Sequence, residues 1–213
     1  MKTFNQFLSF LAICVSFFFL SSCNQGPESV TIDGLEWSTR NLATLTFRNG
    51  DPIPEAKTDD EWYAAGENSQ PAWCYFNNDE KIGKSYGIMY NWFAVNDPRG
   101  LAPEGWHIST QQEWNQITEK FGGEDEAGKA MKSMDDWKEH THASDSSGLN
   151  CLAGGRRDYQ GNFRNLGVDG YFWCQEQYDE RDAWGRNLNY LYPSIQVEYY
   201  NKYFGFSVRC VKD

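Results

Sequence analysis

The chain has 213 residues, of which 30 are acidic and 19 are basic, and its formal net charge at pH 7 is −11. This length predicts one domain with an ample hydrophobic core. The acidity argues against nucleic acid as a partner and against electrostatic attachment to anionic lipid, because both require a positively charged surface. Aromatic residues make up 16% of the chain, which is enough to ask whether some of them do more than pack.

An N-terminal apolar run predicts an export signal. It extends from Phe7 to Leu20 after a single charged residue, Lys2, and is shorter than the roughly 20 residues that a membrane-spanning helix needs. The run closes with Leu20-Ser21-Ser22-Cys23, which resembles the lipobox of bacterial lipoproteins. The resemblance implies that residues 1–22 are a lipoprotein signal peptide and that Cys23 is lipidated and becomes the first mature residue. An ordinary cleavage site near Cys23 is the alternative.

The predicted lipid defines the organisation of the rest of the chain. Two acyl chains anchor a protein stably, since each buried methylene contributes about 0.8 kcal/mol. Residues 23–29 comprise the lipidated cysteine and a polar, proline-containing linker, which predicts a domain that stands off the membrane. Residues 30–213 form the predicted single domain. Its sequence holds no hydrophobic stretch long enough to span a bilayer, so the lipid is the predicted membrane attachment.

The domain is predicted to open with a hairpin and a short helix. Val30–Trp37 has Asp33-Gly34 at its centre, a dipeptide that tolerates the positive φ angles of a type I′ turn. Thr58 and Glu61 have the spacing of a capping box, which predicts a helix N-terminus. Gly66 is a candidate for the left-handed cap that would end this helix.

A second capping box gives the strongest helix signal in the sequence. Thr110 and Glu113 precede apolar residues at helical spacing, and Gly122-Gly123 follows them. A third amphipathic helix is predicted over Glu124–Met134, although Gly128 lowers its helix propensity.

Beyond residue 145 the pattern changes to glycine turns between short aromatic or β-branched runs. Ser194–Tyr200 and Phe204–Val211 are the clearest of these runs, and they predict strands. Helices in the first half and strands in the second, without alternating βαβ units, predict an α+β fold.

Six sequence blocks resemble one family in their order and spacing, the Fibrobacter succinogenes major paralogous domain. The main blocks are Tyr86–Val95 (YGIMYNWFAV), Pro103–Trp114 (PEGWHISTQQEW) and Gly205–Asp213 (GFSVRCVKD). The supporting blocks are Trp37–Leu42 (WSTRNL), Pro71–Asp79 (PAWCYFNND) and Gly148–Arg156 (GLNCLAGGR). Together the blocks cover nearly the whole predicted mature chain.

More distantly, the tryptophan-bearing helix and the terminal Gly-Phe-x-x-Arg-Cys strand resemble the formylglycine-generating-enzyme and C-type-lectin-like superfamily. That resemblance implies a compact α+β domain with two helices, a twisted antiparallel sheet, adjacent termini and long irregular loops. Adjacent termini would place Val30–Trp37 beside Val208–Val211 and leave the middle loops on the face away from the tether.

Four cysteines remain in the predicted mature domain: Cys74, Cys151, Cys174 and Cys210. An even number in an exported chain indicates disulfides, although four cysteines allow three pairings and free buried thiols are the alternative. The family often has cysteine where this chain has Ala102, and small or hydroxylated residues where it has Cys151 and Cys174. The resemblance therefore implies a Cys151–Cys174 disulfide, with Cys74 and Cys210 either paired or reduced and buried.

Candidate metal and catalytic residues are few. His140-Thr141-His142 would be a weak metal site, since its segment has the composition of a solvated loop. Asn77–Glu80 could supply oxygen ligands to calcium but is typical of a polar turn. His107 is predicted to be a hydrogen-bonded structural residue. Motifs for a nucleophile elbow, phosphate loop, Rossmann fold or zincin are absent from the sequence, so no catalytic residue, metal or cofactor is predicted.

Aromatic residues in the second half are the candidate binding residues, because flat rings suit sugar faces and peptide side chains. Trp184 and Tyr190 are the two chosen, whereas Trp92, Trp106 and Trp114 are predicted to lie in the core. The resulting hypothesis is a lipid-anchored protein of the bacterial outer membrane or cell surface, acting as a non-enzymatic binding or adhesion module for glycan or an envelope protein. The alternatives are an envelope enzyme distantly like the formylglycine-generating oxidases and a purely structural envelope protein.

Overall fold

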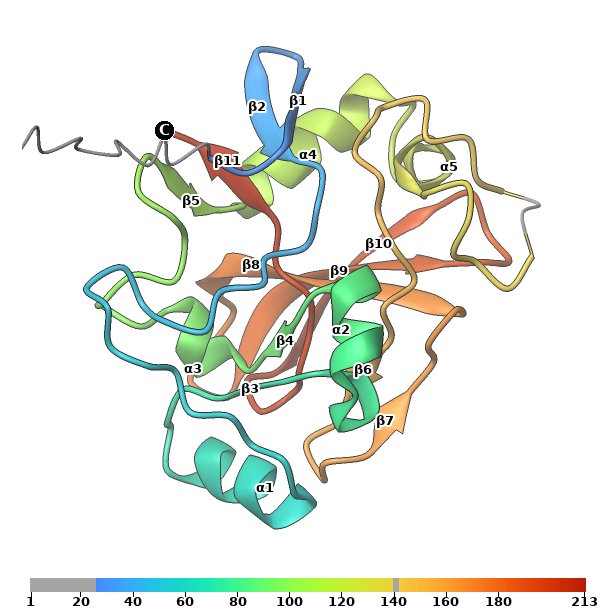
Figure 1. Cartoon of the computed structure of the whole chain (residues 1–213). Coiled ribbons are helices and arrows are strands. Elements are labelled where there is room, and N and C mark those ends of the chain that lie inside the picture. The colour runs from blue at the N-terminus through green and yellow to red at the C-terminus, as the bar shows by residue number, and fades with distance from the viewer. Residues whose placement is uncertain (1–25, 140–141) are drawn as a thin grey trace, which may run out of the picture.

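A computed structural model describes residues 26–139 and 142–213 (Figure 1). The predicted signal peptide and Cys23 lie outside the described residues, as do His140 and Thr141. Within the described ranges, every helix is too short or too polar to cross a membrane.

The two ends of the domain meet in a four-stranded sheet, here called the terminal sheet. It consists of β1 (Ser29–Ile32), β2 (Leu35–Ser38), β11 (Cys210–Lys212) and β5 (Trp106–Ile108), in the order β1-β2-β11-β5. Asp33 and Gly34 have φ angles of 50° and 86°, as the predicted hairpin turn requires. Val211 in β11 pairs with Trp37 in β2, which confirms the prediction that Val30–Trp37 lies beside Val208–Val211.

A second antiparallel sheet forms the centre of the molecule. It has the order β10-β9-β8, with β8 (Asp169–Gln177), β9 (Asp182–Asn189) and β10 (Ile195–Asn201). Because side chains alternate along a strand, Tyr171 and Trp173 point into one core cluster, whereas Phe172 and Cys174 point into another. The predicted strand-rich second half is therefore confirmed.

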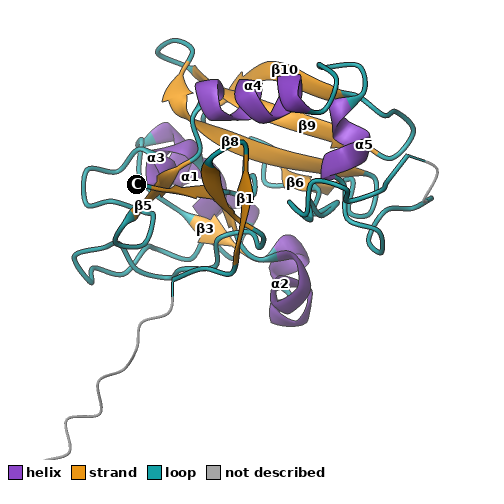
Figure 2. Ribbon diagram, turned by 90° about the horizontal axis from the view of Figure 1, so that it is seen from above, coloured by secondary structure: helices purple, strands orange, loops and turns teal. Residues whose placement is uncertain are grey.

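Two helices cover one face of the central sheet (Figure 2). They are α4 (Gln111–Lys120) and α5 (Ala127–Met131), whose Trp114, Ile117 and Met131 lie in the same buried cluster as Phe172. The third helix, α5, is shorter than the predicted Glu124–Met134, since it begins at Ala127 and ends at Met131. Within it, a Cβ on Gly128 would lie 2.2 Å from the backbone oxygen of Ser194, so this glycine permits close packing.

Both predicted capping boxes are present. In α1 (Asp59–Glu67), Glu61 N donates to Thr58 Oγ1 at 3.1 Å and Thr58 N donates to the Glu61 carboxylate at 2.9 Å. In α4 the same bonds join Thr110 and Glu113, at 3.2 and 2.8 Å. The prediction that Gly66 ends α1 is wrong. Gly66 lies inside the helix, which runs to Glu67. The ring of Tyr203 leaves no room for a side chain at this position, which accounts for the glycine.

The remaining elements are short. They comprise three helical segments, α2 (Glu80–Tyr86), α3 (Trp92–Val95) and the 3-10 turn η1 (Phe76–Asn78), and two small antiparallel pairs, β3 (Trp73–Cys74) with β4 (Met89–Tyr90) and β6 (Arg156–Arg157) with β7 (Phe163–Arg164). The described chain is thus a mixed helix and sheet structure with several small antiparallel sheets and five α-helices, rather than the two that the superfamily resemblance implied.

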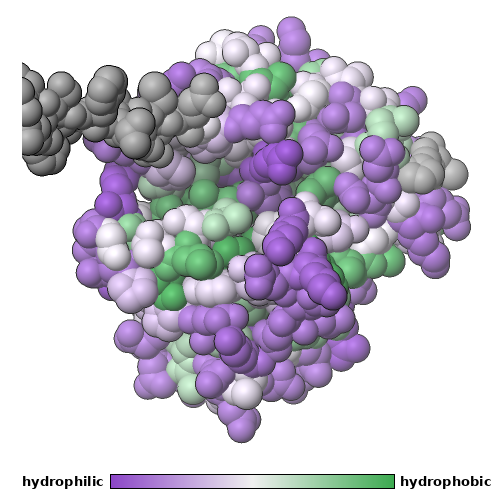
Figure 3. Space-filling view, in the orientation of Figure 1, coloured by the Kyte–Doolittle hydropathy of each residue, from purple (hydrophilic) through white to green (hydrophobic). Residues whose placement is uncertain are grey.

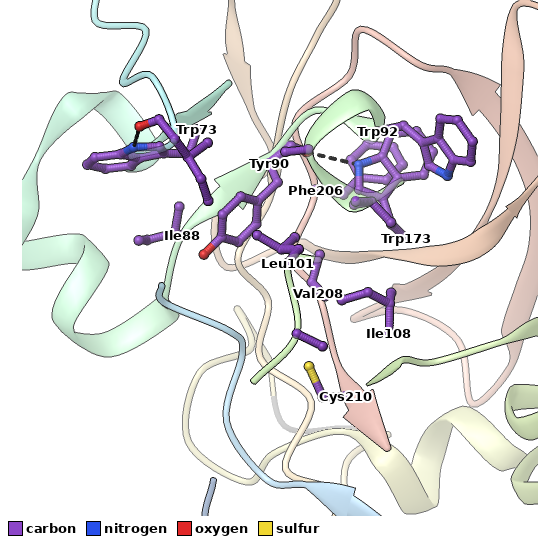
Figure 4. Close-up of a cluster of buried hydrophobic side chains, with 14 of the residues drawn as sticks. Trp73, Ile88, Tyr90, Trp92, Leu101, Ile108, Trp173, Phe206, Val208 and Cys210 are labelled. Atoms are coloured by element: carbon purple, nitrogen blue, oxygen red, sulfur yellow. Dashed lines mark hydrogen bonds between the residues drawn. The ribbon is translucent and has the colours of Figure 1, made fainter. Parts of the chain in front are cut away.

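The core beneath the central sheet is built from stacked rings (Figure 4). Trp173 stacks on Phe206 with their ring centroids 4.3 Å apart, and its Nε1 donates to the backbone oxygen of Tyr90 at 2.9 Å. Trp92, like Trp106 and Trp114, is buried, as predicted. The indole rings of Trp92, Trp114 and Trp173 therefore contribute large buried areas while each N–H group donates a hydrogen bond.

The predicted Cys151–Cys174 disulfide is wrong, because all four described cysteines are free and buried. Cys151 lies in an isolated bridge with Lys132, near Arg209, whereas Cys174 lies on β8 near Arg186. The inferred adjacency of two strands carrying the sulfurs is therefore not formed, and a disulfide needs close, aligned Cβ atoms. Burial raises the pKa of each thiol to about 12, so both stay protonated.

Cys74 and Cys210 are likewise reduced and buried, which is one of the two states predicted for them. Burial raises the pKa of both thiols to about 12. Figure 4 shows the sulfur of Cys210 among apolar side chains, where a neutral thiol behaves as a small hydrophobic group.

Candidate binding surface

Three aromatic side chains gather at one end of the central sheet and are here called the aromatic triad: Tyr178, Trp184 and Tyr199. Trp184 in β9 and Tyr199 in β10 lie directly opposite each other in the strand register. Tyr178 follows β8 and returns to the sheet because its N–H donates to the backbone oxygen of Asp182 at 2.9 Å. The turn between β8 and β9 therefore brings the third ring to the pair.

The rings of the triad are ordered and exposed. Tyr178 and Tyr199 stack with centroids 4.2 Å apart and an interplanar angle of 9°, and both meet Trp184 edge-on. The two tyrosines are 48% and 52% exposed, whereas Trp184 is half-buried. Beside them is a shallow hollow of about 510 Å³, lined by Trp184, Val197, Glu198 and Tyr199. A planar ligand face could lie on this surface without displacing any core residue.

Tyr190, the second residue chosen from the sequence, is not part of this surface. It lies six residues beyond Trp184, about 20 Å away if the chain stays extended. Its ring packs against the cluster under α4, and Lys138 Nζ lies 5.4 Å from the ring centroid. Trp184 and Tyr190 both pack against this cluster, but Trp184 meets the rings of Tyr178 and Tyr199, whereas Lys138 lies over the ring of Tyr190.

Tyr178 was not predicted from the sequence. It precedes the turn between β8 and β9, and no local sequence motif indicates how that turn folds. In the sequence, Tyr199 is one of several tyrosines in the second half and carries no signal that sets it apart. The alternation Val197, Tyr199 in β10 would have placed these two on one strand face. Pairing Tyr199 with Trp184 requires the strand register, which only the folded hairpin supplies.

A buried lysine holds the turn that supports the triad. Lys202 Nζ donates to Gln177 Oε1 at 3.2 Å and to the backbone oxygens of Asp179 and Glu180 at 2.7 and 3.0 Å. The ammonium also lies 4.8 Å from the ring centroid of Trp92. Burial lowers the pKa of Lys202, although nearby carboxylates oppose that change. The turn is therefore ordered before any ligand arrives.

A polar hollow of about 600 Å³ lies elsewhere, between α2 and the loop after β2. It opens on the face shown in Figure 3, where apolar areas are small and separated by polar ones. Its charged lining includes Arg40, Lys84, Asp135 and Asp136, and no aromatic ring lines it. This hollow therefore lacks the flat faces that make the triad a candidate for sugar or side-chain binding.

His107 is hydrogen-bonded on both sides, as predicted for a structural residue. Nδ1 lies 2.7 Å from the Asp213 carboxylate and Nε2 lies 2.7 Å from Glu113. Burial lowers the pKa of His107, but the hydrogen bonds and charges of the two carboxylates outweigh it, so the pKa lies above its usual value. His107 thus joins the end of the terminal sheet to the capping box of α4.

Three residues considered for calcium binding, Asn77, Asn78 and Asp79, shape or bond the backbone. Asn77 and Asn78 adopt positive φ angles, Asn78 Nδ2 donates to the backbone oxygen of Lys57 at 2.6 Å, and the Asp79 carboxylate caps α2. Across residues 26–139 and 142–213, no three His, Cys, Asp or Glu side chains come close enough together to hold a metal ion.

Arg209, in the terminal Gly-Phe-Ser-Val-Arg-Cys block, hydrogen-bonds to residues of other sequence blocks that resemble the family. Its buried guanidinium donates to Asn41 Oδ1 at 2.8 Å and to the backbone oxygens of Ser38, Leu149 and Asn150 at 2.7, 2.9 and 2.6 Å. Burial lowers the pKa of Arg209, although nearby groups that include the Asp145 carboxylate oppose that change. The block thus joins three sequence regions through one side chain.

Comparison with known proteins connects these observations to one family. No curated protein and no solved structure matches the chain. The family model described as the Fibrobacter succinogenes major domain matches residues 30–212, which is nearly all of the described structure. The matched range holds the hairpin, both capping boxes and the block around Arg209. The chain belongs to the Fibrobacter succinogenes major domain family.

Proposed function

We propose that this protein is a glycan-binding module of the bacterial cell envelope, anchored by lipid on Cys23 to the outer membrane or cell surface. The observation that carries the proposal is the exposed aromatic triad, since exposed aromatic area clustered on an ordered surface marks binding sites more often than scattered rings do. The lipobox-like sequence supports the anchor. The acidic composition supports an uncharged partner rather than nucleic acid.

The ring geometry suits a sugar. An aromatic ring has a negative face, and the C–H groups on one side of a sugar ring present a weakly positive apolar face to it. Trp184 and Val197 offer an apolar floor, and Tyr199 adds a wall and a phenol that can hydrogen-bond to hydroxyls. Glu198 lines the same hollow and offers carboxylate oxygens as acceptors. Apolar stacking combined with a few polar groups is the usual composition of a small-ligand site.

The state of the thiols supports binding rather than cysteine chemistry. A nucleophilic cysteine needs an accessible thiolate. The four described thiols are buried with pKa values raised to about 12, so each stays protonated near neutral pH. We also propose that the domain is distantly similar to C-type-lectin-like proteins. In that arrangement the termini are adjacent and the binding loops lie on the side away from them.

An envelope protein is the second candidate partner, because β10 is the edge strand of the central sheet. Its outward backbone groups around Val197 could pair with an extended segment of another chain. A peptide partner would use this strand edge and the triad together.

A binding screen tests the proposal. The full chain, in a detergent without sugar headgroups, is applied to a glycan array and to glycan-free envelope proteins. We expect binding to a glycan that falls at least tenfold in Trp184→Ala and Tyr199→Ala but persists in Tyr190→Ala, the matched aromatic control. Glycan binding that survives both triad substitutions would contradict the proposed site. Binding only to envelope proteins would favour the second candidate.

The anchor has its own test. Cys23→Ala should abolish metabolic labelling with a palmitate analogue and leave the precursor uncleaved by the lipoprotein peptidase. Labelling that persists in this variant would refute lipidation at Cys23 without affecting the glycan-binding proposal.

A further inference from the structure

A second ring-lined site lies on the other side of the turn between β8 and β9. This corner hollow has a volume of about 390 Å³ and is lined by four aromatic side chains: Tyr63 of α1, Phe93 of α3, Tyr159 between β6 and β7, and Tyr203 after β10. Tyr63 and Tyr159 are 46% and 45% exposed. The volume lies at the small end of the range for small-molecule sites, which begins at about 300 Å³.

One wall of the corner hollow is fixed by tight packing. An added Cβ on Gly66 would lie 2.5 Å from Cγ of Tyr203, so the helix and this ring are already in close contact. Trp62 Nε1 donates to the backbone oxygen of Tyr203 at 2.8 Å, and Tyr203 N donates to Asn201 Oδ1 at 2.9 Å. Gly66 was predicted to end the helix; instead, its lack of a side chain allows the ring of Tyr203 to pack against α1.

The turn that carries Tyr159 is fixed by Arg157. The buried guanidinium donates to the backbone oxygens of Gly161, Ala56 and Thr58 at distances of 2.9, 2.7 and 2.9 Å. These bonds join the turn to the N-terminus of α1. The rings on both sides of the hollow are therefore held in place without a ligand, which lowers the entropy cost of binding one.

The carboxylate of Glu67 lines this hollow together with the phenols of Tyr63 and Tyr203. Glu67 is one helical turn after Tyr63, and its charge raises the pKa of Tyr63. Burial raises the pKa of Tyr203, and Glu67 raises it further. A carboxylate has about four acceptor positions, so two phenols leave it able to accept hydrogen bonds from a ligand.

The charges that line the hollow are balanced. Glu67 and Glu180 oppose Arg181 and Lys202, and the ammonium of Lys202 is already occupied by three oxygen atoms. Such a balance favours a neutral ligand with hydroxyl groups over an anion or an organic cation.

We propose that the corner hollow binds one neutral sugar residue, with a ring face on Tyr63 and Tyr159 and two hydroxyls on Glu67. The site is separate from the aromatic triad and shares with the proposed function only the class of ligand. It lies toward α1, at the opposite end of the molecule from the terminal sheet (Figure 1). The two sites meet the turn between β8 and β9 from opposite sides, so one branched or extended glycan could contact both.

Titration with simple sugars tests this inference. The probes are the methyl glycosides of glucose, galactose, mannose and N-acetylglucosamine, with glucuronate and choline as charged comparators. Binding to the full chain, in a detergent without sugar headgroups, is measured by saturation-transfer NMR and calorimetry. We expect at least one neutral glycoside to bind and its affinity to fall about tenfold in Glu67→Gln, the usual effect of losing a hydrogen bond to a charged group.

Separate variants distinguish the two sites. Tyr159→Ala should weaken the same glycoside about fivefold, whereas Glu119→Gln, on the exposed face of α4, should leave its affinity unchanged. No binding of any neutral glycoside, or tighter binding of glucuronate or choline, would overturn the inference. So would glycoside binding that Trp184→Ala abolishes and Glu67→Gln preserves, a result that would leave the aromatic triad as the glycan site.

Discussion

The two ends of the molecule use aromatic side chains in opposite ways. Near the terminal sheet, Trp37 and Trp114 are fully buried and meet edge to face with centroids 5.0 Å apart. Around the turn between β8 and β9, Tyr178 and Tyr199 stack even more closely, with centroids 4.2 Å apart, but about half of each side chain is exposed. The difference teaches that ring stacking alone does not identify core residues. Exposure distinguishes the stacked rings of the proposed ligand surface from those of the packed interior.

The largest expected contrast comes from truncating one ring at each end. Trp114→Ala should cost about 3–5 kcal/mol of unfolding free energy, since it removes a fully buried side chain. Tyr199→Ala should cost less than about 1 kcal/mol, because its ring is mostly in water. Urea denaturation followed by circular dichroism measures both values. Similar losses in the two variants would show that Tyr199 belongs to the core after all.

Arg209→Met tests whether the end near the termini depends on one polar side chain as well as on rings. The substitution leaves four oxygen acceptors without their donor, which should cost about 3 kcal/mol. Arg40→Met is the matched control, because Arg40 makes only an exposed ion pair with Glu28. Comparable denaturation midpoints for these two variants would mean that the Arg209 bonds contribute little net stability.

Gly66→Ala tests the packing of rings at the end of the molecule near α1, away from the terminal sheet. Alanine inside a helix ordinarily stabilises it by about 0.5–1 kcal/mol, but here the new methyl group would meet the ring of Tyr203 and the variant should lose about 1–3 kcal/mol. Adding Tyr203→Ala to Gly66→Ala should remove this clash, so the two losses should not add. Thermal melts of the single and double variants decide the sign. A more stable Gly66→Ala protein would refute the close approach.

His107 should make the stability of the end near the termini depend on pH. Its pKa is raised in the folded state, so the protonated ring stabilises the fold below the unfolded pKa of about 6.5, and this contribution disappears as the pH rises through the folded value. His107→Gln should therefore cost up to about 1 kcal/mol at pH 5.5 and much less at pH 9, with partial exposure limiting the effect. A loss that does not change with pH would indicate a purely steric role.

The smallest expected effect is that of reducing agent. With Cys74, Cys151, Cys174 and Cys210 all free, dithiothreitol should leave the melting temperature unchanged. A Cys151–Cys174 bridge would close a loop of about 20 residues and contribute on the order of 3 kcal/mol, so its reduction would be easily seen. Alkylation under denaturing, non-reducing conditions should label all four cysteines. Any pair protected from alkylation would restore the disulfide hypothesis.

The sequence predicted most accurately those features whose determinants lie within a few residues of each other. The Thr58 and Thr110 capping boxes and the Asp33-Gly34 turn depend on bonds and φ angles inside one short segment, and each was found where expected. The family blocks added one long-range feature, the pairing of β2 with β11. Of the three rings in the aromatic triad, only Trp184 was chosen as a binding candidate from the sequence, and that choice stays a prediction.

Two errors share one cause. Gly66 was expected to end a helix and Cys151 to bond Cys174, and in both cases residues distant in sequence decided the outcome. Tyr203 occupies the space beside Gly66, and Cys151 pairs with Lys132 rather than with a strand next to Cys174. Composition and spacing carry no information about such contacts, because they arise from how separate elements pack.

Local interactions thus determined the helix starts, the first turn and the strand-rich second half, since each depends on propensity and on bonds that span few residues. Tertiary structure alone decided which rings remain exposed. Alternation along β9 and β10 puts Trp184 and Tyr199 on one face, but their meeting depends on register, and Tyr178 joins them only through a turn held by the buried Lys202. The corner hollow likewise forms only where α1, α3 and two turns converge. Gly66 lacks a side chain, and the ring of Tyr203 packs in the space that one would occupy.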